Sequence, residues 1–346
     1  MGITYVQLRQ SVPAVQAFQD IDKALDEGVE GVDDVDRMRD LAYLSMARTY
    51  YSASVKLDSA GNPKIDEKKL SAAVKYWNRV DVSSEYWLDA LFEESWAYFM
   101  AGDYPHALGN IHTIESPYFP NSFYPEAEIL KAIVYLTTCQ YEDATTITAQ
   151  MKLKYQPIKK DLQGILDKYA GETADEQFFD FLKKVRDGKA GLSPDLEPIV
   201  KNALSDRQLL RNIEYVDQLD EERKRFNSMD SGFKGSDLGN DITDALDLAR
   251  QVAIRKAGTL ARDRYQRYVD ELSEHLRNAQ KIIIDVTNAE RGRIEEAAAG
   301  RMTKEESDIY GVVEQDDEHE LWPFDGEYWR DELGFYRQVV VSKCKK

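Results

Sequence analysis

Two stretches of the chain repeat the same order of apolar, small and aromatic residues, with the second 37 residues after the first (125 − 88 = 37). Each stretch has apolar positions three and four residues apart, which is typical of short amphipathic helices. Small residues recur where two antiparallel helices would cross, and an aromatic residue follows one turn later. We therefore expect two helical hairpins. The first copy is marked by Leu88, Ala90, Ser95, Tyr98 and Ala107, and the second by Pro125, Ala127, Ala132, Tyr135 and Ala144.

A turn separates the two helices of each hairpin. In the first copy it is Gly102-Asp103-Tyr104, and glycine favours the backbone angles that end a helix. In the second copy Cys139 stands in the place of that glycine. The alternative is a plain helical hairpin that recurs by chance, although the small, aromatic and turn residues all recur at matching offsets.

The same register extends toward the N-terminus. Residues 40–52 match a first helix with Ala47 at the small position, and residues 70–80 match its partner, with a polar insertion at 56–64 between them. Further upstream Phe18 fits a second helix, and Gly2 falls on the small position of a first helix. The chain would then begin inside a repeat, so we expect a fragment that lacks any upstream signal or anchor. A degenerate first repeat is the alternative.

The pattern changes after residue 157. We predict repeats over 1–157, a helical cap or junction over 158–195 and a long helical hairpin over 196–303. The hairpin would pair a helix at about 196–228 with one at about 240–299, as an antiparallel coiled coil. Lys256 and Arg264 interrupt the apolar stripe of the second helix, and Gly258 is a candidate kink.

Residues 304–346 form a tail that is first acidic and then aromatic, with six aromatic residues between 321 and 336. Such a run is not left in water without a reason. Either it folds back on the helices or it docks on another protein, and helical spacing would put several of its side chains on one face. The candidate docking residues are Trp322, Phe324, Tyr328, Trp329 and Tyr336.

Composition narrows the function classes. Proline is scarce and alternating strand-like runs are nearly absent, which predicts an all-α fold. A net charge of −18 disfavours nucleic acid and anionic lipid as partners. No apolar run approaches the ~20 residues that span a bilayer, so direct membrane insertion is not expected. Cys139 and Cys344 are too few for a disulfide framework and are compatible with free thiols.

No catalytic or metal-binding pattern stands out. The four histidines, at 106, 112, 275 and 319, lack the spacings of metal sites. No phosphate-binding glycine loop or nucleophile elbow is present. We expect no catalytic residue, no metal and no cofactor, and hence a non-enzymatic protein. A metal-dependent module or unrecognised enzyme around His319, which is flanked by acidic residues, is the third alternative.

The remaining candidate is a binding surface on the first helix of each pair, which lines the concave side of a repeat stack. It is unusually apolar, so it either meets a partner or packs on the next turn of the array. The residues expected there are Leu44, Arg48, Tyr51, Phe92, Trp96, Phe99, Met100, Ile129, Ile133 and Leu136.

The repeats at 40–157 resemble the tetratricopeptide repeat family. This resemblance implies a helical solenoid that scaffolds other proteins. The tail at 324–337 is also similar to C-terminal segments of tetratricopeptide proteins from gliding and predatory bacteria, some of them in the myxobacterial gliding-motility envelope complex. That similarity implies a periplasmic or envelope-associated location. A structural oligomer that self-associates through the long helices is the alternative function.

Overall fold

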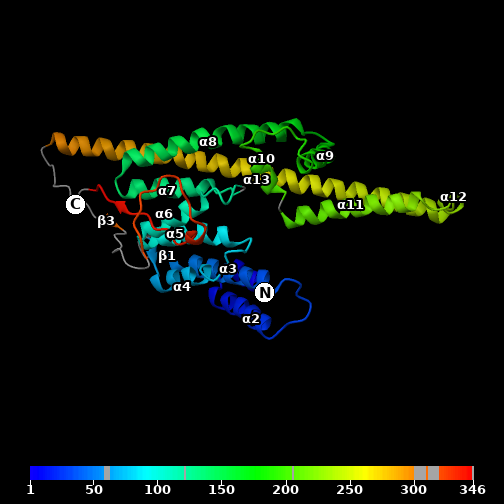
Figure 1. Ribbon diagram of the computed structural model, residues 1–346, viewed down its shortest axis with the longest axis horizontal. Helices are drawn as coiled ribbons and strands as arrows, with labels where there is room; N and C mark the ends of the chain where they lie inside the picture. The colour runs from blue at the N-terminus through cyan, green and yellow to red at the C-terminus, as the bar shows by residue number, and fades with distance from the viewer. Residues whose placement is uncertain (58–62, 121, 205, 300–308, 311–318, 345–346) are drawn as a thin grey trace. The chain divides into compact units, whose positions relative to one another are not determined.

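The computed structural model is mostly helical, which confirms the predicted all-α class. Thirteen α-helices, one 3-10 helix and four strands of two or three residues lie in the part of the chain that it describes (Figure 1). That part comprises residues 1–57, 63–120, 122–204, 206–299, 309–310 and 319–344. The chain divides into two compact units. Unit 1 comprises Met1–Phe119, Leu130–Thr145 and Asp285–Lys346, and unit 2 comprises Pro120–Ile129 and Thr146–Ile284.

Unit 1 contains the N-terminal helices, in contact along the chain from α1 to α6. Three of them begin at an aspartate: the carboxylates of Asp34, Asp66 and Asp103 each accept a hydrogen bond from the backbone N–H three residues later. The helices are α1 (Gly2–Gln7), α2 (Ser11–Asp26), α3 (Val35–Ser54), α4 (Glu67–Trp77), α5 (Trp87–Ala101) and α6 (Tyr104–Ile114), with parts of α7 (Pro125–Thr137), α8 (Tyr141–Lys168) and α13 (Asp237–Ala298).

The small residues of the repeated pattern lie in the core. Ser95, Ala107, Ala132 and Ala144 are all fully buried. At the N-terminus an added Cβ on Gly2 would collide with the ring of Phe18, so α1 and α2 approach closely at that glycine. A larger side chain at these positions would force neighbouring helices apart.

Short strand pairs accompany the helices of unit 1. Strands β1 (Val55–Leu57) and β2 (Pro63–Ile65) pair antiparallel between α3 and α4, where the sequence suggested a polar insertion. Strands β3 (Ile309–Tyr310) and β4 (Val340–Val341) also pair antiparallel. The second pair is part of the C-terminal tail, which crosses α5 and α6 (Figure 1).

Unit 2 contains α9 (Ala174–Arg186), α10 (Glu197–Ala203), α11 (Arg207–Asn227) and α12 (Ser231–Lys234), with most of α8 and α13. Its core includes Phe178 and Tyr265, whose ring centroids lie 5.2 Å apart. The Tyr265 hydroxyl donates a hydrogen bond to the Val200 carbonyl at 3.2 Å. Helices α11 and α13 lie side by side beyond α10 (Figure 1), and Arg250 Nε lies 2.5 Å from Asp220 Oδ1 between them.

Several expectations need correction. The helix expected over about 196–228 is two helices, because the chain leaves helical geometry between α10 and α11. Gly258 does not break α13, which is continuous; instead its bare Cα allows close approach of the Asp175 backbone. The aromatic tail does not form the helix that its spacing suggested. Among its described residues the helical geometry is limited to one 3-10 turn, Arg330–Glu332.

Candidate interaction surfaces

Helix α5 carries a row of large apolar side chains that the fold buries only in part. Phe92, Trp96, Phe99 and Met100 lie four, three and one residues apart on one face, and all are half-buried. Leu91 and Ala97, on the opposite side, are buried in the core. The rings of Trp96 and Phe99 meet edge to face at 5.9 Å, so the row is ordered by its own contacts.

The three candidates on α3 have different environments. Leu44 is only 1% exposed and belongs to the core. The exposed Arg48 guanidinium forms an ion pair with Glu93 of α5, with Nε to carboxylate distances of 2.8 and 2.9 Å. The Tyr51 hydroxyl contacts the Met100 sulfur at 3.2 Å. Arg48 and Tyr51 therefore connect α3 to the α5 row.

The α7 candidates also differ in burial. Ile129 is buried, whereas Ile133 and Leu136 are half-buried. Ile129 belongs to unit 2 and the other two to unit 1. Of the ten residues expected on the concave face, eight are thus at least partly exposed: Arg48, Tyr51, Phe92, Trp96, Phe99, Met100, Ile133 and Leu136.

The aromatic tail gathers around His112 of α6. The His112 ring stacks on Tyr328 at 4.5 Å and meets Phe324 and Tyr336 edge on, at 4.5 and 5.1 Å. Burial lowers the pKa of His112 and raises that of Tyr336. The neutral imidazole is therefore the form that fits this aromatic cluster.

Two further tail aromatics complete the cluster. The Trp322 ring lies 4.7 Å from Trp329 and 5.5 Å from Tyr336. The Trp329 backbone N–H donates to the Tyr336 hydroxyl at 2.8 Å, and that hydroxyl donates to the Trp329 carbonyl at 3.1 Å. All five candidate tail residues therefore contact one another or His112 within the same chain.

Tail backbone also contacts α6. The Gly334 N–H donates to the Thr113 hydroxyl at 2.9 Å, and the Gln338 N–H donates to the Pro105 carbonyl at 3.0 Å. An added Cβ on Gly109 would collide with the Tyr336 carbonyl. Sequence reasoning missed these contacts. The only available signal was a glycine in the middle of a helix, which often marks a close approach of another backbone.

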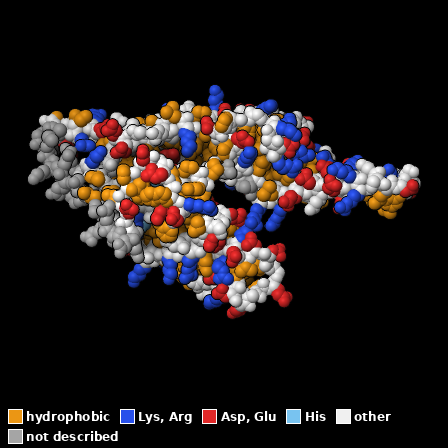
Figure 2. All heavy atoms as spheres, viewed as in Figure 1, with side chains coloured by type: hydrophobic (Ala, Val, Ile, Leu, Met, Phe, Trp, Pro, Cys, Tyr) orange, Lys and Arg blue, Asp and Glu red, His pale blue; other side chains and the backbone are white. Residues whose placement is uncertain are grey.

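The outer side of the tail remains in solvent. Phe335 is 73% exposed, and Leu321, Phe324 and Trp329 are exposed as well. Hydrophobic side chains gather on the face where the tail crosses α5 and α6 (Figure 2). The tail thus covers one apolar surface and presents another.

The cysteines were expected to be compatible with free thiols, and the structure instead joins them. Cys139, directly after α7, forms a disulfide with Cys344 near the end of the tail, with their Cα atoms 4.9 Å apart. The Lys343 N–H donates to the Thr138 carbonyl at 2.8 Å beside this bond. Covalent and hydrogen bonds therefore attach the end of the tail to the end of α7.

A buried polar cluster lies beneath the α5 row. The Glu94 carboxylate is 3% exposed and accepts hydrogen bonds from the side-chain amides of Asn78 and Asn110, at 2.7 and 3.0 Å. Burial raises the pKa of Glu94 to about 7. Nearby, His106 Nδ1 lies 2.7 Å from the Asp103 carboxylate, and its ring stacks on Tyr98.

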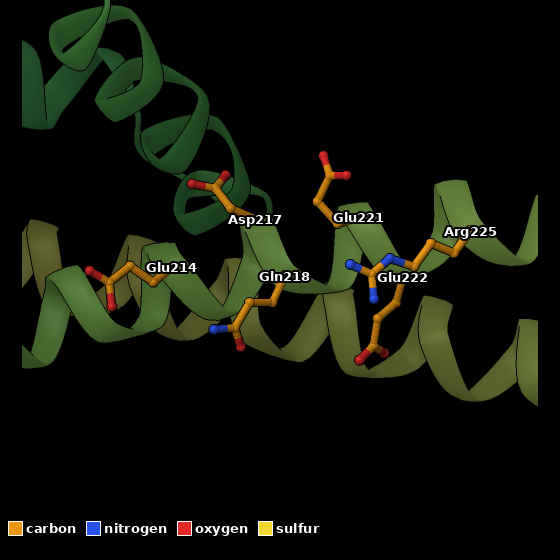
Figure 3. Close-up of a pocket in the computed structure, with 6 residues that line it drawn as sticks. All are labelled: Glu214, Asp217, Gln218, Glu221, Glu222 and Arg225. Atoms are coloured by element: carbon orange, nitrogen blue, oxygen red, sulfur yellow. The ribbon is translucent and has the colours of Figure 1, made fainter.

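Helix α11 carries a hollow of about 490 Å³ with charged walls, shown in Figure 3. Its residues are Glu214, Asp217, Gln218, Glu221, Glu222 and Arg225. They lie along a single helix, and the acidic side chains outnumber the one cation. Nothing at the hollow identifies a ligand.

The described ranges hold neither a metal-binding cluster nor a membrane-spanning helix. No group of three or more His, Cys, Asp or Glu side chains is arranged there to hold a metal ion. Residues 314–318, which include four of the acidic side chains near His319, lie outside these ranges. No described helix combines the length and apolar character needed to cross a bilayer.

Comparison with protein-family models, curated proteins and solved structures finds no match to this chain.

Proposed function

We propose that the chain is a non-enzymatic scaffold that binds other proteins through tetratricopeptide-like helical hairpins. The observation that carries the proposal is the half-buried row on α5, Phe92, Trp96, Phe99 and Met100. Large apolar side chains at this spacing are typical of surfaces that bind a partner segment. The ion pair between Arg48 and Glu93 supports a binding role, because it gives the row a polar border.

Affinity capture with the full chain as bait tests this surface. Trp96→Ala and Phe99→Ala each remove an aromatic side chain from the row, and we expect each to reduce capture of a specific partner at least tenfold. Leu153→Ala is the matched control, because Leu153 is 77% exposed on α8 and belongs to unit 2, whereas the row belongs to unit 1. Unchanged capture by both aromatic variants would show that this face is not the binding site.

We further propose that the protein works outside the cytoplasm, as part of a bacterial gliding-motility or envelope machine. Two observations support it: the Cys139–Cys344 disulfide, because disulfides persist in oxidising compartments, and the sequence similarity of the aromatic tail. Alkylating free thiols in intact cells tests the compartment. We expect both cysteines to resist alkylation until a reductant is added, whereas immediate labelling of both would contradict an oxidising location.

A structural oligomer is the second candidate function. Leu238, Leu248 and Val252 on α13 are 60%, 64% and 58% exposed, although α13 also packs on α11. Such residues can form the seam of a coiled coil with a second chain. Size-exclusion chromatography with light scattering distinguishes the candidates. A strict monomer at high concentration contradicts the oligomer, whereas an oligomer that Leu248→Ser dissociates supports it.

A further inference from the structure

The end of the tail lies on α6 and α7 as an extended segment. Burial alternates along it: Tyr336, Val340 and Ser342 are buried, whereas the residues between them are half-buried or exposed. Two backbone hydrogen bonds join it to helical hairpin residues, from Gln338 N–H to the Pro105 carbonyl and from Lys343 N–H to the Thr138 carbonyl, and its strand β4 pairs with β3 of the same tail. The bond between Lys343 and Thr138 lies beside the disulfide, because each residue directly precedes one of the two cysteines.

Cys139 occupies a backbone conformation that normally requires glycine. Its φ is 57°, and the corresponding residue of the preceding hairpin, Gly102, has φ 78° (102 + 37 = 139). The hydrogen bonds that end the two helices also match: residues 102 and 139 donate to the carbonyl three positions back, and the following residues to the carbonyl five positions back. This left-handed backbone costs free energy for cysteine, whose Cβ crowds the following carbonyl, but not for glycine.

That cost has a local explanation in the bond to Cys344. A glycine would end α7 equally well but could not form a cross-link. Strained backbone that persists in a fold points to a function for the residue that carries it. Cysteine at this position therefore serves the attachment of the tail rather than the helix end.

We propose that the Cys139–Cys344 disulfide is a redox latch, whose reduction by a dithiol frees residues 338–344 from α6 and α7. A thiolate of the dithiol attacks the half-buried Sγ of Cys344, the Sγ–Sγ bond breaks, and Cys139 leaves as a thiolate that takes up a proton. The second thiol of the reductant then displaces Cys344. The protein gains two electrons and two protons, and the reductant becomes a disulfide.

The upstream part of the tail has an anchor that does not depend on the disulfide. The Tyr336 ring is buried against His112, and the Gly334 N–H donates a hydrogen bond to the Thr113 hydroxyl. Reduction therefore detaches the end of the tail and uncovers the Tyr135 hydroxyl, which accepts a hydrogen bond from the Gln338 side chain at 2.8 Å. This inference stands independently of the proposed scaffold role.

Hydrogen exchange of the full chain, with and without dithiothreitol, tests the latch. We expect the Lys343 and Gln338 amides to exchange at least tenfold faster after reduction, and to slow again on reoxidation. Far-UV circular dichroism should show that the helices remain. Exchange at Lys343 that stays within twofold of the oxidised value would overturn the proposal, as would two reactive thiols in protein never exposed to reductant.

Two variants distinguish the effect of losing the disulfide from the effect of relieving backbone strain at the end of α7. Cys344→Ser breaks the bond and keeps the strained residue, whereas Cys139→Gly breaks the bond and relieves the strain. Both should show fast exchange at Lys343 that dithiothreitol does not change, although Cys139→Gly ends α7 more stably. Slow exchange at Lys343 in both variants would mean that hydrogen bonds and packing alone hold the tail.

Discussion

Glu94 shows how one buried carboxylate can make stability depend on pH. Its pKa is raised to about 7 by burial, against 4.5 for the unperturbed group. Between these values the folded chain binds more protons than the unfolded chain, so stability falls as pH rises. The favourable contribution of Glu94 to the free energy of unfolding is fully present below pH 4.5 and is lost as the pH rises through 7. Its size is on the order of 3 kcal/mol.

Glu94→Gln removes this titration while keeping a polar side chain among Asn78 and Asn110. Urea unfolding at pH 5 and pH 8 should show that the wild type loses about 2 kcal/mol more than the variant between the two conditions. The difference between the two proteins is the readout, because the net charge of −18 makes both sensitive to pH. Equal losses in both would show that Glu94 does not titrate in this range.

Gly109 controls the approach of the tail to α6. An added Cβ there would collide with the backbone of Tyr336, so Gly109→Ala must displace the tail. We expect the Gly334 and Gln338 amides to exchange at least tenfold faster, since both donate hydrogen bonds from this segment. Overpacking costs about 1 to 3 kcal/mol, and the gain in helix propensity of about 1 kcal/mol offsets part of it.

Gly164→Ala in α8 is the matched control, because nothing lies within 4 Å of its added Cβ. It should stabilise the chain by about 0.5 to 1 kcal/mol and leave tail exchange unchanged. If Gly109→Ala behaved in the same way, the tail would not rest on α6 at this glycine.

Among the helices, α13 combines a tight crossing with an open surface. An added Cβ at Gly258 would meet the Asp175 backbone, whereas one at Gly292 meets nothing within 4 Å. Gly258→Ala should therefore destabilise the chain by about 1 to 3 kcal/mol, and Gly292→Ala should be neutral or stabilising. Thermal unfolding followed by circular dichroism measures both. Equal effects would mean that α9 does not pack closely at Gly258.

The helices of unit 1 were predictable because local chemistry determines them. Small residues such as Ser95 and Ala107 recur at one offset, and Gly102 with Asp103 marks the end of one helix and the start of the next. The break between α10 and α11 was not predicted, since the apolar pattern continues across it. The tail was assigned helical spacing, but hydrogen bonds from Gly334 and Gln338 go to residues more than 200 positions away.

Periodicity alone could not predict how exposed the residues of the candidate surface are. Periodicity put Leu44 and Trp96 on equivalent faces, yet one is buried and the other half-buried, because neighbouring helices cover them differently. The pairing of Cys139 with Cys344 needs the folded path of the tail, which no local pattern contains. Cys139 in the place of a turn glycine was the one clue in the sequence.

At the scale of the whole molecule, the disulfide joins two residues that are 205 apart in the chain and both in unit 1. The loop that it closes contains the whole segment Thr146–Ile284 of unit 2. In the chain-entropy model, closing a loop of about 200 residues raises the free energy of the unfolded chain by about 5 kcal/mol. Measured effects are often smaller because real unfolded chains retain some structure.

Reduction should therefore lower the free energy of unfolding of unit 1 by about 3 to 5 kcal/mol. The chain has five tryptophans, at positions 77, 87, 96, 322 and 329, and all lie in unit 1, so their fluorescence follows that unit alone. Urea titrations with and without reductant measure the shift. The double variant Cys139→Ser with Cys344→Ser should have the same free energy of unfolding as the reduced wild type, whether or not reductant is present. If reductant also left the urea midpoint and the slope of the wild-type transition unchanged, the cross-link would not constrain the unfolded chain.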